Sequence, residues 1–125
     1  MAFAIVHFTV GFVAVLAVLS LLPLTRYRLT GAYLGGIWAL VPDAWRLDAA
    51  GLGRWLHALH DSPRAEVFFF HRTLDAPAYR AHNLELTFLS LLVLGVAFVV
   101  HDRRFGSGRT ILRRLRGRDV SERFP

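Results

Sequence analysis

The sequence predicts an all-α integral membrane protein, a helical bundle with three transmembrane helices, or four in the alternative. Three observations favour this class. Hydrophobic residues make up 54% of the 125 residues, with a mean hydropathy of +0.42, whereas an ordinary soluble domain has about 45–50% apolar residues. They gather in long blocks rather than at amphipathic spacing. These blocks are flanked by arginine, as membrane spans often are. The length allows one domain.

The first predicted span covers about residues 2–24. It contains no charged side chain unless His7 is protonated. About 20 apolar residues cross the hydrocarbon core of a bilayer, so the segment is long enough. Arg26, Tyr27 and Arg28 follow it, a combination typical of the membrane–water interface.

The second and third predicted spans cover about residues 27–45 and 83–101. The apolar part of the second, Leu29–Pro42, is short and suits a re-entrant segment as well as a full span. We prefer the full span, with Arg28 extending to the interface. In the third, Glu85 is the only charge before Val100.

A polar segment, Arg46–Arg80, connects the second and third spans. It contains one apolar stripe at i, i+3, i+4 and i+7 spacing, which predicts a helix lying in the membrane interface; its residues are Leu52, Trp55, Leu56 and Leu59. In the four-span alternative, Val67–Leu74 enters the bilayer.

Residues 102–125 form an arginine-rich tail after the transmembrane domain of residues 1–101. Arginine placement predicts that the tail is cytoplasmic, in contact with anionic lipid headgroups, in a multi-pass protein of the plasma membrane. A basic block can also bind nucleic acid. We do not expect a nucleic-acid partner here, because the block directly follows an apolar span.

Ionisable residues at membrane depth are candidates for function. Three antiparallel crossings bring one end of each span, and the polar segment, to the same side of the membrane. The ionisable residues expected there are His7, Asp43, His57, His60, Asp61, His71, His82 and Glu85. Each of them, taken alone, can also be explained as a helix cap or an interfacial side chain.

Small residues predict how the first two spans pack. Gly11 lies on the same face of the first span as His7, and Gly31 and Gly35 lie at i+4 spacing with Asp43 on the second. Small residues let helix backbones approach closely. Packing of these two faces would bring His7 near Asp43.

Imidazole and carboxylate ligands suit a divalent ion such as zinc or manganese. The chain has no cysteine, so thiolate ligands are excluded. His57 and Asp61, at i, i+4 spacing, are candidate ligands or supporting residues. A haem held by His7 with His71 or His82 is a weaker alternative.

Three short motifs carry a resemblance. His7 is followed by Gly11 in the first span, Pro42-Asp43 ends the second, and His71-Arg72 comes later. In these the chain resembles a family of small membrane-bound, predicted metal-dependent hydrolases, whose motifs are similar to those of zinc-dependent phospholipase C. The residues after Asp43 and Arg72 depart from that family, so the chain would be a degenerate or truncated relative.

The resemblance implies that His7, Asp43 and His71 are the metal ligands. Further or alternative ligands would be His82, Glu85, His57 and Asp61. The implied function is hydrolysis of a phosphate ester or lipid-like substrate at the membrane surface. The alternative is a non-catalytic helical subunit or adaptor, which would bind another membrane protein through Gly31, Gly35 and the arginine tail.

Overall fold

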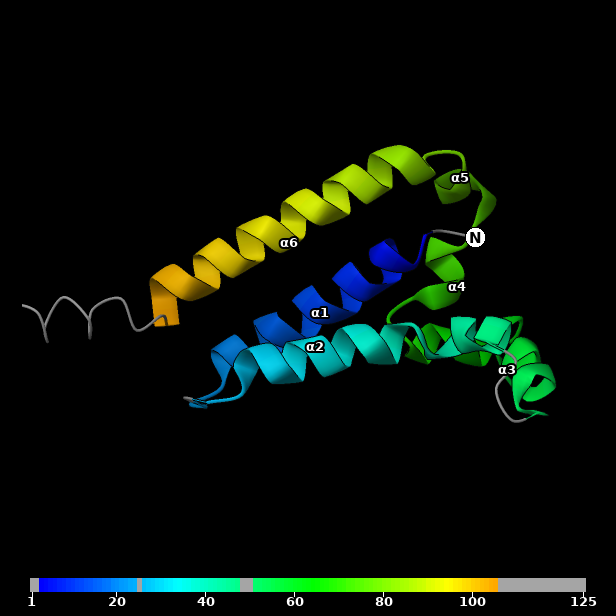
Figure 1. The fold of residues 1–125 in the computed structure, drawn as a ribbon, viewed down its shortest axis with the longest axis horizontal. Helices are drawn as coiled ribbons and strands as arrows, with labels where there is room; N and C mark the ends of the chain where they lie inside the picture. Colours follow the sequence, from blue (N-terminus) through cyan, green and yellow to red (C-terminus); the bar gives the residue numbers. More distant parts are fainter. Residues whose placement is uncertain (1–2, 25, 48–50, 106–125) are drawn as a thin grey trace, which may run out of the picture. The chain divides into compact units, whose positions relative to one another are not determined.

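The structure is a computed structural model that describes residues 3–24, 26–47 and 51–105. Over these residues the chain is helical and contains no strand (Figure 1). It divides into one compact unit up to Leu94 and a second from Gly95 onward. Two helices are long and apolar enough to cross a membrane: α1, Ala4–Leu21, and α6, Asn83–Phe105.

Helix α1 ends where proline prevents its continuation. Leu22 is extended, with φ −84° and ψ 152°. It precedes Pro23, and a residue before proline is driven out of the α region. The helix therefore has 18 residues, about 27 Å at ~1.5 Å per residue, which approaches the ~30 Å of a hydrocarbon core.

The segment predicted as one span over residues 27–45 is not a single α-helix. Helix α2 covers Arg28–Ala39, and the chain continues as the 3-10 helix η1, Val41–Leu47. Pro42 is the physical reason, because proline lacks the N–H of a regular helix and its ring clashes with the carbonyl four residues earlier. The 12 residues of α2 rise only about 18 Å.

Helices α1 and α2 pack side by side as an antiparallel pair (Figure 1). Gly11 faces the carbonyl oxygen of Gly35, so that a Cβ at Gly11 would collide with it. A Cβ at Gly31 would lie 2.6 Å from Leu19, which also belongs to α1. These glycines are thus used inside the chain to bring the two backbones together.

Short helices lie at the end of this pair where α1 begins and α2 ends (Figure 1). Helix α3, Gly53–His60, packs on η1 and contains most of the predicted interfacial stripe. It is followed by the 3-10 helix η3, Pro63–Val67, and by two single-turn helices, α4, His71–Leu74, and α5, Pro77–Arg80. Val67–Leu74, the extra span of the four-span alternative, comprises the end of η3, a turn and α4.

Helix α6 extends the third predicted segment by four residues, from 101 to 105. As far as Leu94, only Ser90 of this helix is buried, and large apolar side chains are exposed. The less exposed positions Asn83, Leu86, Thr87 and Ser90 form one stripe of the helix, and the exposed apolar surface on its other sides suits contact with lipid. The rest of the predicted tail, residues 106–125, lies outside the described residues.

Candidate metal centre

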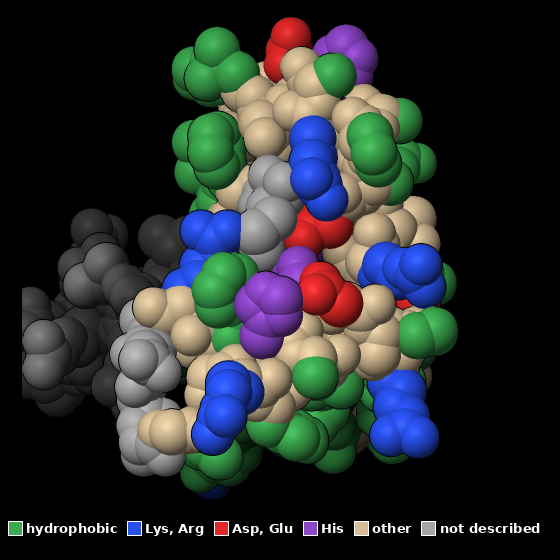
Figure 2. All heavy atoms as spheres, turned by 90° about the vertical axis from the view of Figure 1, so that its right-hand side faces the viewer, with side chains coloured by type: hydrophobic (Ala, Val, Ile, Leu, Met, Phe, Trp, Pro, Cys, Tyr) green, Lys and Arg blue, Asp and Glu red, His purple; other side chains and the backbone are tan. Residues whose placement is uncertain are grey.

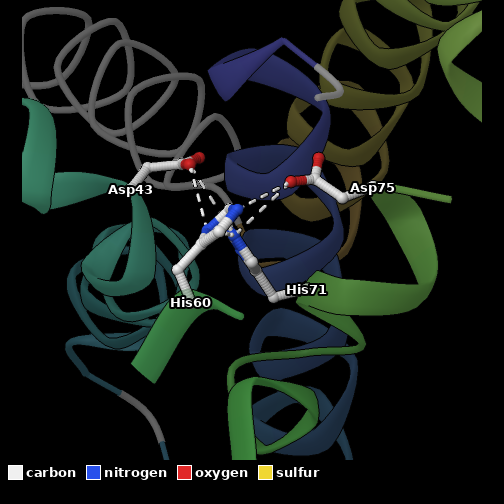
Figure 3. Close-up of side chains that lie close together, drawn as sticks. All are labelled: Asp43, His60, His71 and Asp75. Atoms are coloured by element: carbon white, nitrogen blue, oxygen red, sulfur yellow. Dashed lines mark hydrogen bonds and ion pairs between the residues drawn. The ribbon is translucent and has the colours of Figure 1, made fainter. Parts of the chain in front are cut away.

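Four side chains from three helical segments meet at the end of the α1–α2 pair. They are Asp43 of η1, His60 of α3, His71 of α4, and Asp75, which caps the C-terminus of α4 (Figure 3). One ligand atom from each residue lies within 4.8 Å of all the others. This cluster, Asp43, His60, His71 and Asp75, could hold a metal ion, and we call it the Asp/His cluster.

The separations within the Asp/His cluster match those between ligands of one ion. Nε2 of His71 lies 3.1 Å from Nδ1 of His60, and each of these nitrogens lies 3.7 Å from Oδ1 of Asp43. Ligands at ~2.0–2.2 Å from a tetrahedral ion are about 3.4 Å apart. On the other side, Oδ2 of Asp75 lies 4.0 Å from Nε2 of His71 and 3.5 Å from Nε2 of His60, the second nitrogen of that ring.

The protein fixes which nitrogen of His71 faces the cluster. Its Nδ1–H donates a hydrogen bond to the carbonyl oxygen of Ala39, at 3.2 Å, because a carbonyl can only accept. Nε2 is therefore left with a lone pair inside the cluster, where Nδ1 of His60 lies 3.1 Å away and can donate to it. In metal-binding histidines generally, a hydrogen bond from the ring nitrogen that does not bind the metal orients the ring, and Nδ1 of His71 makes such a bond to Ala39.

Electrostatics keep His71 in its neutral form. Burial lowers the pKa of His71, as does the neighbouring His7, and the carboxylates of Asp43 and Asp75 only partly offset this. The side chain of His71 is fully buried. Neutral imidazole is the form that binds a metal ion, so competition from protons is weak at this position.

Asp43 has a side-chain oxygen, Oδ1, that is buried without a hydrogen-bond donor among the described residues. A buried carboxylate oxygen without a donor is costly. A cation between Asp43 and the two imidazoles would remove that cost, so the donor set and its geometry both fit a divalent ion.

Two consecutive left-handed residues direct the chain into α4. Phe69 and Phe70 have φ of 54° and 60°, an unusual conformation for residues other than glycine. Phe68, just before them, is stacked on Trp38 of α2 with ring centroids 4.8 Å apart. This contact anchors the end of η3 on α2, and the turn then places His71 beside Ala39.

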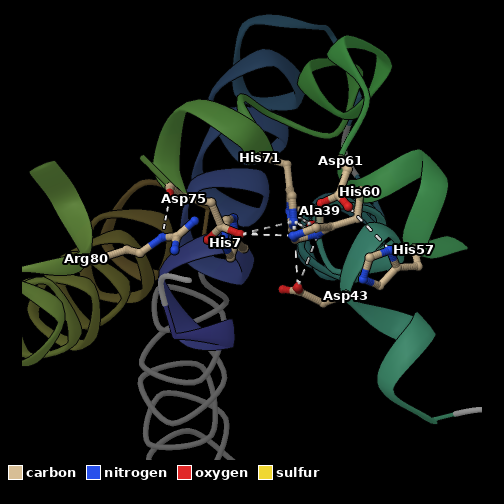
Figure 4. Close-up of polar contacts among 9 residues, drawn as sticks. All are labelled: His7, Ala39, Asp43, His57, His60, Asp61, His71, Asp75 and Arg80. Atoms are coloured by element: carbon tan, nitrogen blue, oxygen red, sulfur yellow. Dashed lines mark hydrogen bonds and ion pairs between the residues drawn. The ribbon is translucent and has the colours of Figure 1, made fainter. Parts of the chain in front are cut away.

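His7, one of the predicted ligands, lies against the cluster but is not one of its four members. It is fully buried. Its Nε2 lies 3.2 Å from Oδ1 of Asp75, and its ring stacks on that of His71 with a centroid distance of 4.1 Å (Figure 4). The structure thus places His7 beside His71 and Asp75, and it places His71 beside Asp43.

The other predicted site residues form two exposed pairs outside the Asp/His cluster. His57 and Asp61 pair across one turn of α3 at 3.3 Å, with side chains 51% and 64% exposed. His82 and Glu85 pair at 3.9 Å, and they are 67% and 71% exposed. Neither pair is within the group of atoms that could share an ion.

The sequence prediction did not include His60 and Asp75 among the ligands. Asp75 lies at i+4 from His71, so the two share one face of a helical turn, and this spacing was a signal in the sequence. His60 was expected on the same side of the membrane as the site, but nothing in the sequence distinguished it from His57 as a ligand. It lies three residues from His57 on the same short helix, and only the packing of α3 on η1 separates the two.

The fold and the site define the chain as a helical protein with two helices able to cross a membrane and a buried Asp/His cluster able to hold a metal ion. No family model, curated protein or solved structure matches it.

Proposed function

We propose that this protein is a multi-pass protein of the plasma membrane that binds a divalent metal ion, zinc or manganese, in the Asp/His cluster. With the ion it hydrolyses a phosphate ester or a lipid-like substrate at the membrane surface. The observation that carries the proposal is the buried oxygen of Asp43, which faces two imidazole nitrogens at 3.7 Å and accepts no hydrogen bond from the described residues.

The arrangement of the chain supports the membrane part of the proposal. Helix α1 has His7 in its second turn, so the cluster lies level with one end of that apolar helix. In the three-crossing topology α2 and η1 return the chain to that same end, and α6 then crosses away from it. The cluster would then face water at the outer surface, with the tail in the cytoplasm.

The surroundings of the cluster support an anionic substrate. Figure 2 shows the face formed by the short helices, where histidine and acidic side chains lie near the middle and arginines surround them. The arginines of this segment are exposed; they are Arg46, Arg54, Arg64, Arg72 and Arg80. Guanidinium groups suit phosphate, which they can bind through two parallel hydrogen bonds.

Each protein group has a place in the proposed chemistry. A bound divalent ion polarises a phosphoryl oxygen and lowers the pKa of a water ligand toward ~7. The carboxylates of Asp43 and Asp75 and the imidazoles of His60 and His71 would hold that ion, and the water would be a fifth ligand. The side chains of Asp43 and His60, 15% and 11% exposed, form the edge of the cluster that is open to solvent and so to a substrate.

The adaptor alternative is less well supported. It depends on Gly31, Gly35 and the arginine tail binding a partner. The two glycines pack against α1 of the same chain, and residues 106–125 of the tail lie outside the described residues. A Cβ at either position would meet Leu19 or Val15.

Metal content and phosphodiester hydrolysis test the proposal. The protein, purified in mild detergent and incubated with zinc or manganese, should retain about one ion per chain by elemental mass spectrometry. It should also cleave bis-p-nitrophenyl phosphate and short-chain phosphatidylcholine. Asp43→Asn should lose both properties, because it replaces an anionic ligand by a neutral amide.

Asp61→Asn is the matched control, because Asp61 is an acid of the same segment whose carboxylate pairs with His57 outside the cluster. It should retain the metal and the activity. Wild-type protein without a stoichiometric ion would refute the metal site. Protein that binds the ion and cleaves neither substrate would refute the hydrolase activity alone.

A further inference from the structure

We propose that His7 is a positioning residue of the metal centre and not one of its ligands. It donates its Nε2–H to Oδ1 of Asp75 and so keeps the other oxygen, Oδ2, directed at the ion. This inference depends on the proposed metal site and adds to it the residue of α1 that the cluster itself does not include.

The hydrogen bond follows from the chemistry of the two groups. Nε2 of His7 lies 3.2 Å from Oδ1 of Asp75, and both side chains are at least nine-tenths buried. An ionised carboxylate can only accept, so Nε2 must carry the proton and donate. A nitrogen that carries a proton has no lone pair for a metal ion, which removes Nε2 as a ligand.

The other nitrogen of His7 is not available either. Nδ1 is buried and has no hydrogen-bond partner among the described residues, and the ligand group that could share an ion does not include it. The His7 ring is instead stacked on His71, 23° from parallel. Two stacked imidazoles present their faces to each other, whereas two ligands of one ion point their nitrogens at a common centre.

The two carboxylate oxygens of Asp75 make different contacts. Oδ1 accepts from His7, and Oδ2 faces His60 and His71 at 3.5 Å and 4.0 Å. The backbone carbonyl of Asp75 accepts a hydrogen bond from Nε of Arg80 at 2.5 Å (Figure 4). With its main chain held by Arg80 and one oxygen held by His7, the second oxygen has a fixed direction.

His71 of α4 and Asp75, the residue that caps it, are therefore held by two different helices. Ala39, the last residue of α2, fixes His71, and His7 of α1 fixes Asp75. Such supporting hydrogen bonds typically contribute ~10–100-fold to metal affinity. His7 thereby connects the metal centre to an apolar helix that could cross the membrane.

Substitution of His7 by glutamine or asparagine distinguishes a residue that positions Asp75 from a residue that binds the metal ion. The amide nitrogen of glutamine reaches about as far as Nε2 of histidine, and that of asparagine only as far as Nδ1. We expect His7→Gln to bind cobalt(II), used as a coloured probe for zinc, nearly as tightly as wild type. His7→Asn should bind it about 10–100-fold more weakly, at an unchanged stoichiometry and with an unchanged visible spectrum.

Thr9→Val, a near-isosteric change at a buried position two residues away, controls for disturbance of α1 and should leave cobalt binding unchanged. Should His7→Asn not yield folded protein by circular dichroism, His7→Leu replaces it, since leucine keeps the apolar volume and lacks the donor.

Three results would overturn the inference. The first is equal affinity in all His7 variants. The second is a loss in His7→Gln as large as in His7→Asn. The third is a changed cobalt spectrum in His7→Gln, which would make His7 a ligand. Failure of the wild-type protein to bind cobalt would instead refute the metal site itself.

Discussion

At the scale of single residues, exposure separates histidines that look alike in the sequence. His57 and His60 are three residues apart on α3, yet the side chain of His57 is 51% exposed and that of His60 only 11%. Trp45 of η1 lies against both rings. His60, on the inner side of that contact, reaches His71 and Asp75, while His57 pairs with Asp61 at the surface.

Replacing these two histidines by alanine should therefore have very different effects. We expect His60→Ala to lower zinc affinity by more than about 100-fold, beyond the usual effect of losing a supporting residue. His57→Ala should change it less than about twofold, because its exposed pair contributes little. Competition with a fluorescent zinc chelator measures both, and similar losses in the two variants would place the ion elsewhere.

At the scale of elements, the approach of α1 to α2 positions the cluster. Gly11 lies against the carbonyl of Gly35, and a Cβ there would lie only 2.8 Å from the Cβ of Ala39. Ala39 is the residue whose carbonyl oxygen holds His71. A side chain at position 11 would therefore push against the end of α2, and so against the residue that holds His71.

Gly11→Ala should accordingly weaken both the fold and the metal site. We expect the free energy of unfolding to fall by about 1–3 kcal/mol, the usual cost of overpacking. Circular dichroism during titration with a denaturing detergent measures this loss. Zinc affinity should fall in parallel. Gly95→Ala is the control, because a Cβ at Gly95 of α6 meets nothing within 4 Å. Equal destabilisation by both changes would contradict the proposed role of the glycine contact.

At the scale of the whole molecule, the proposed number of crossings would decide which side of a membrane carries the Asp/His cluster. Helices α1 and α6 are each long and apolar enough to cross. Helix α2 alone is too short, so a third crossing needs η1 as its continuation. In the proposed three-crossing topology the segment with α3 lies on one side, and Arg26 and the tail lie on the other.

The absence of cysteine makes this topology directly measurable. Single cysteines at Arg26, Ala58 and Ser107 can be labelled with a membrane-impermeant maleimide in intact cells. We expect labelling at Ala58 alone, and at Arg26 and Ser107 only after permeabilisation, because arginine-rich segments stay in the cytoplasm. If Arg26 and Ala58 label together, α2 does not cross.

The sequence by itself determined the elements that depend on local chemistry. The apolar blocks predict the two long helices, and the i, i+3, i+4 stripe predicts α3. The glycine spacing brings His7 and Asp43 to the same end of the α1–α2 pair. Pro42 breaks the predicted second span into α2 and η1. The sequence contains this cause, but the length of the apolar run favoured the prediction of one continuous span.

Only the tertiary structure decided which polar side chains meet. His60 joins the Asp/His cluster and His57 does not, because α3 packs on η1 with one face inward. Asp75 joins it because the turn at Phe69 and Phe70 directs α4 toward Ala39. Contacts between residues tens of positions apart depend on how short helices are anchored, and neither hydropathy nor spacing along the chain contains that information.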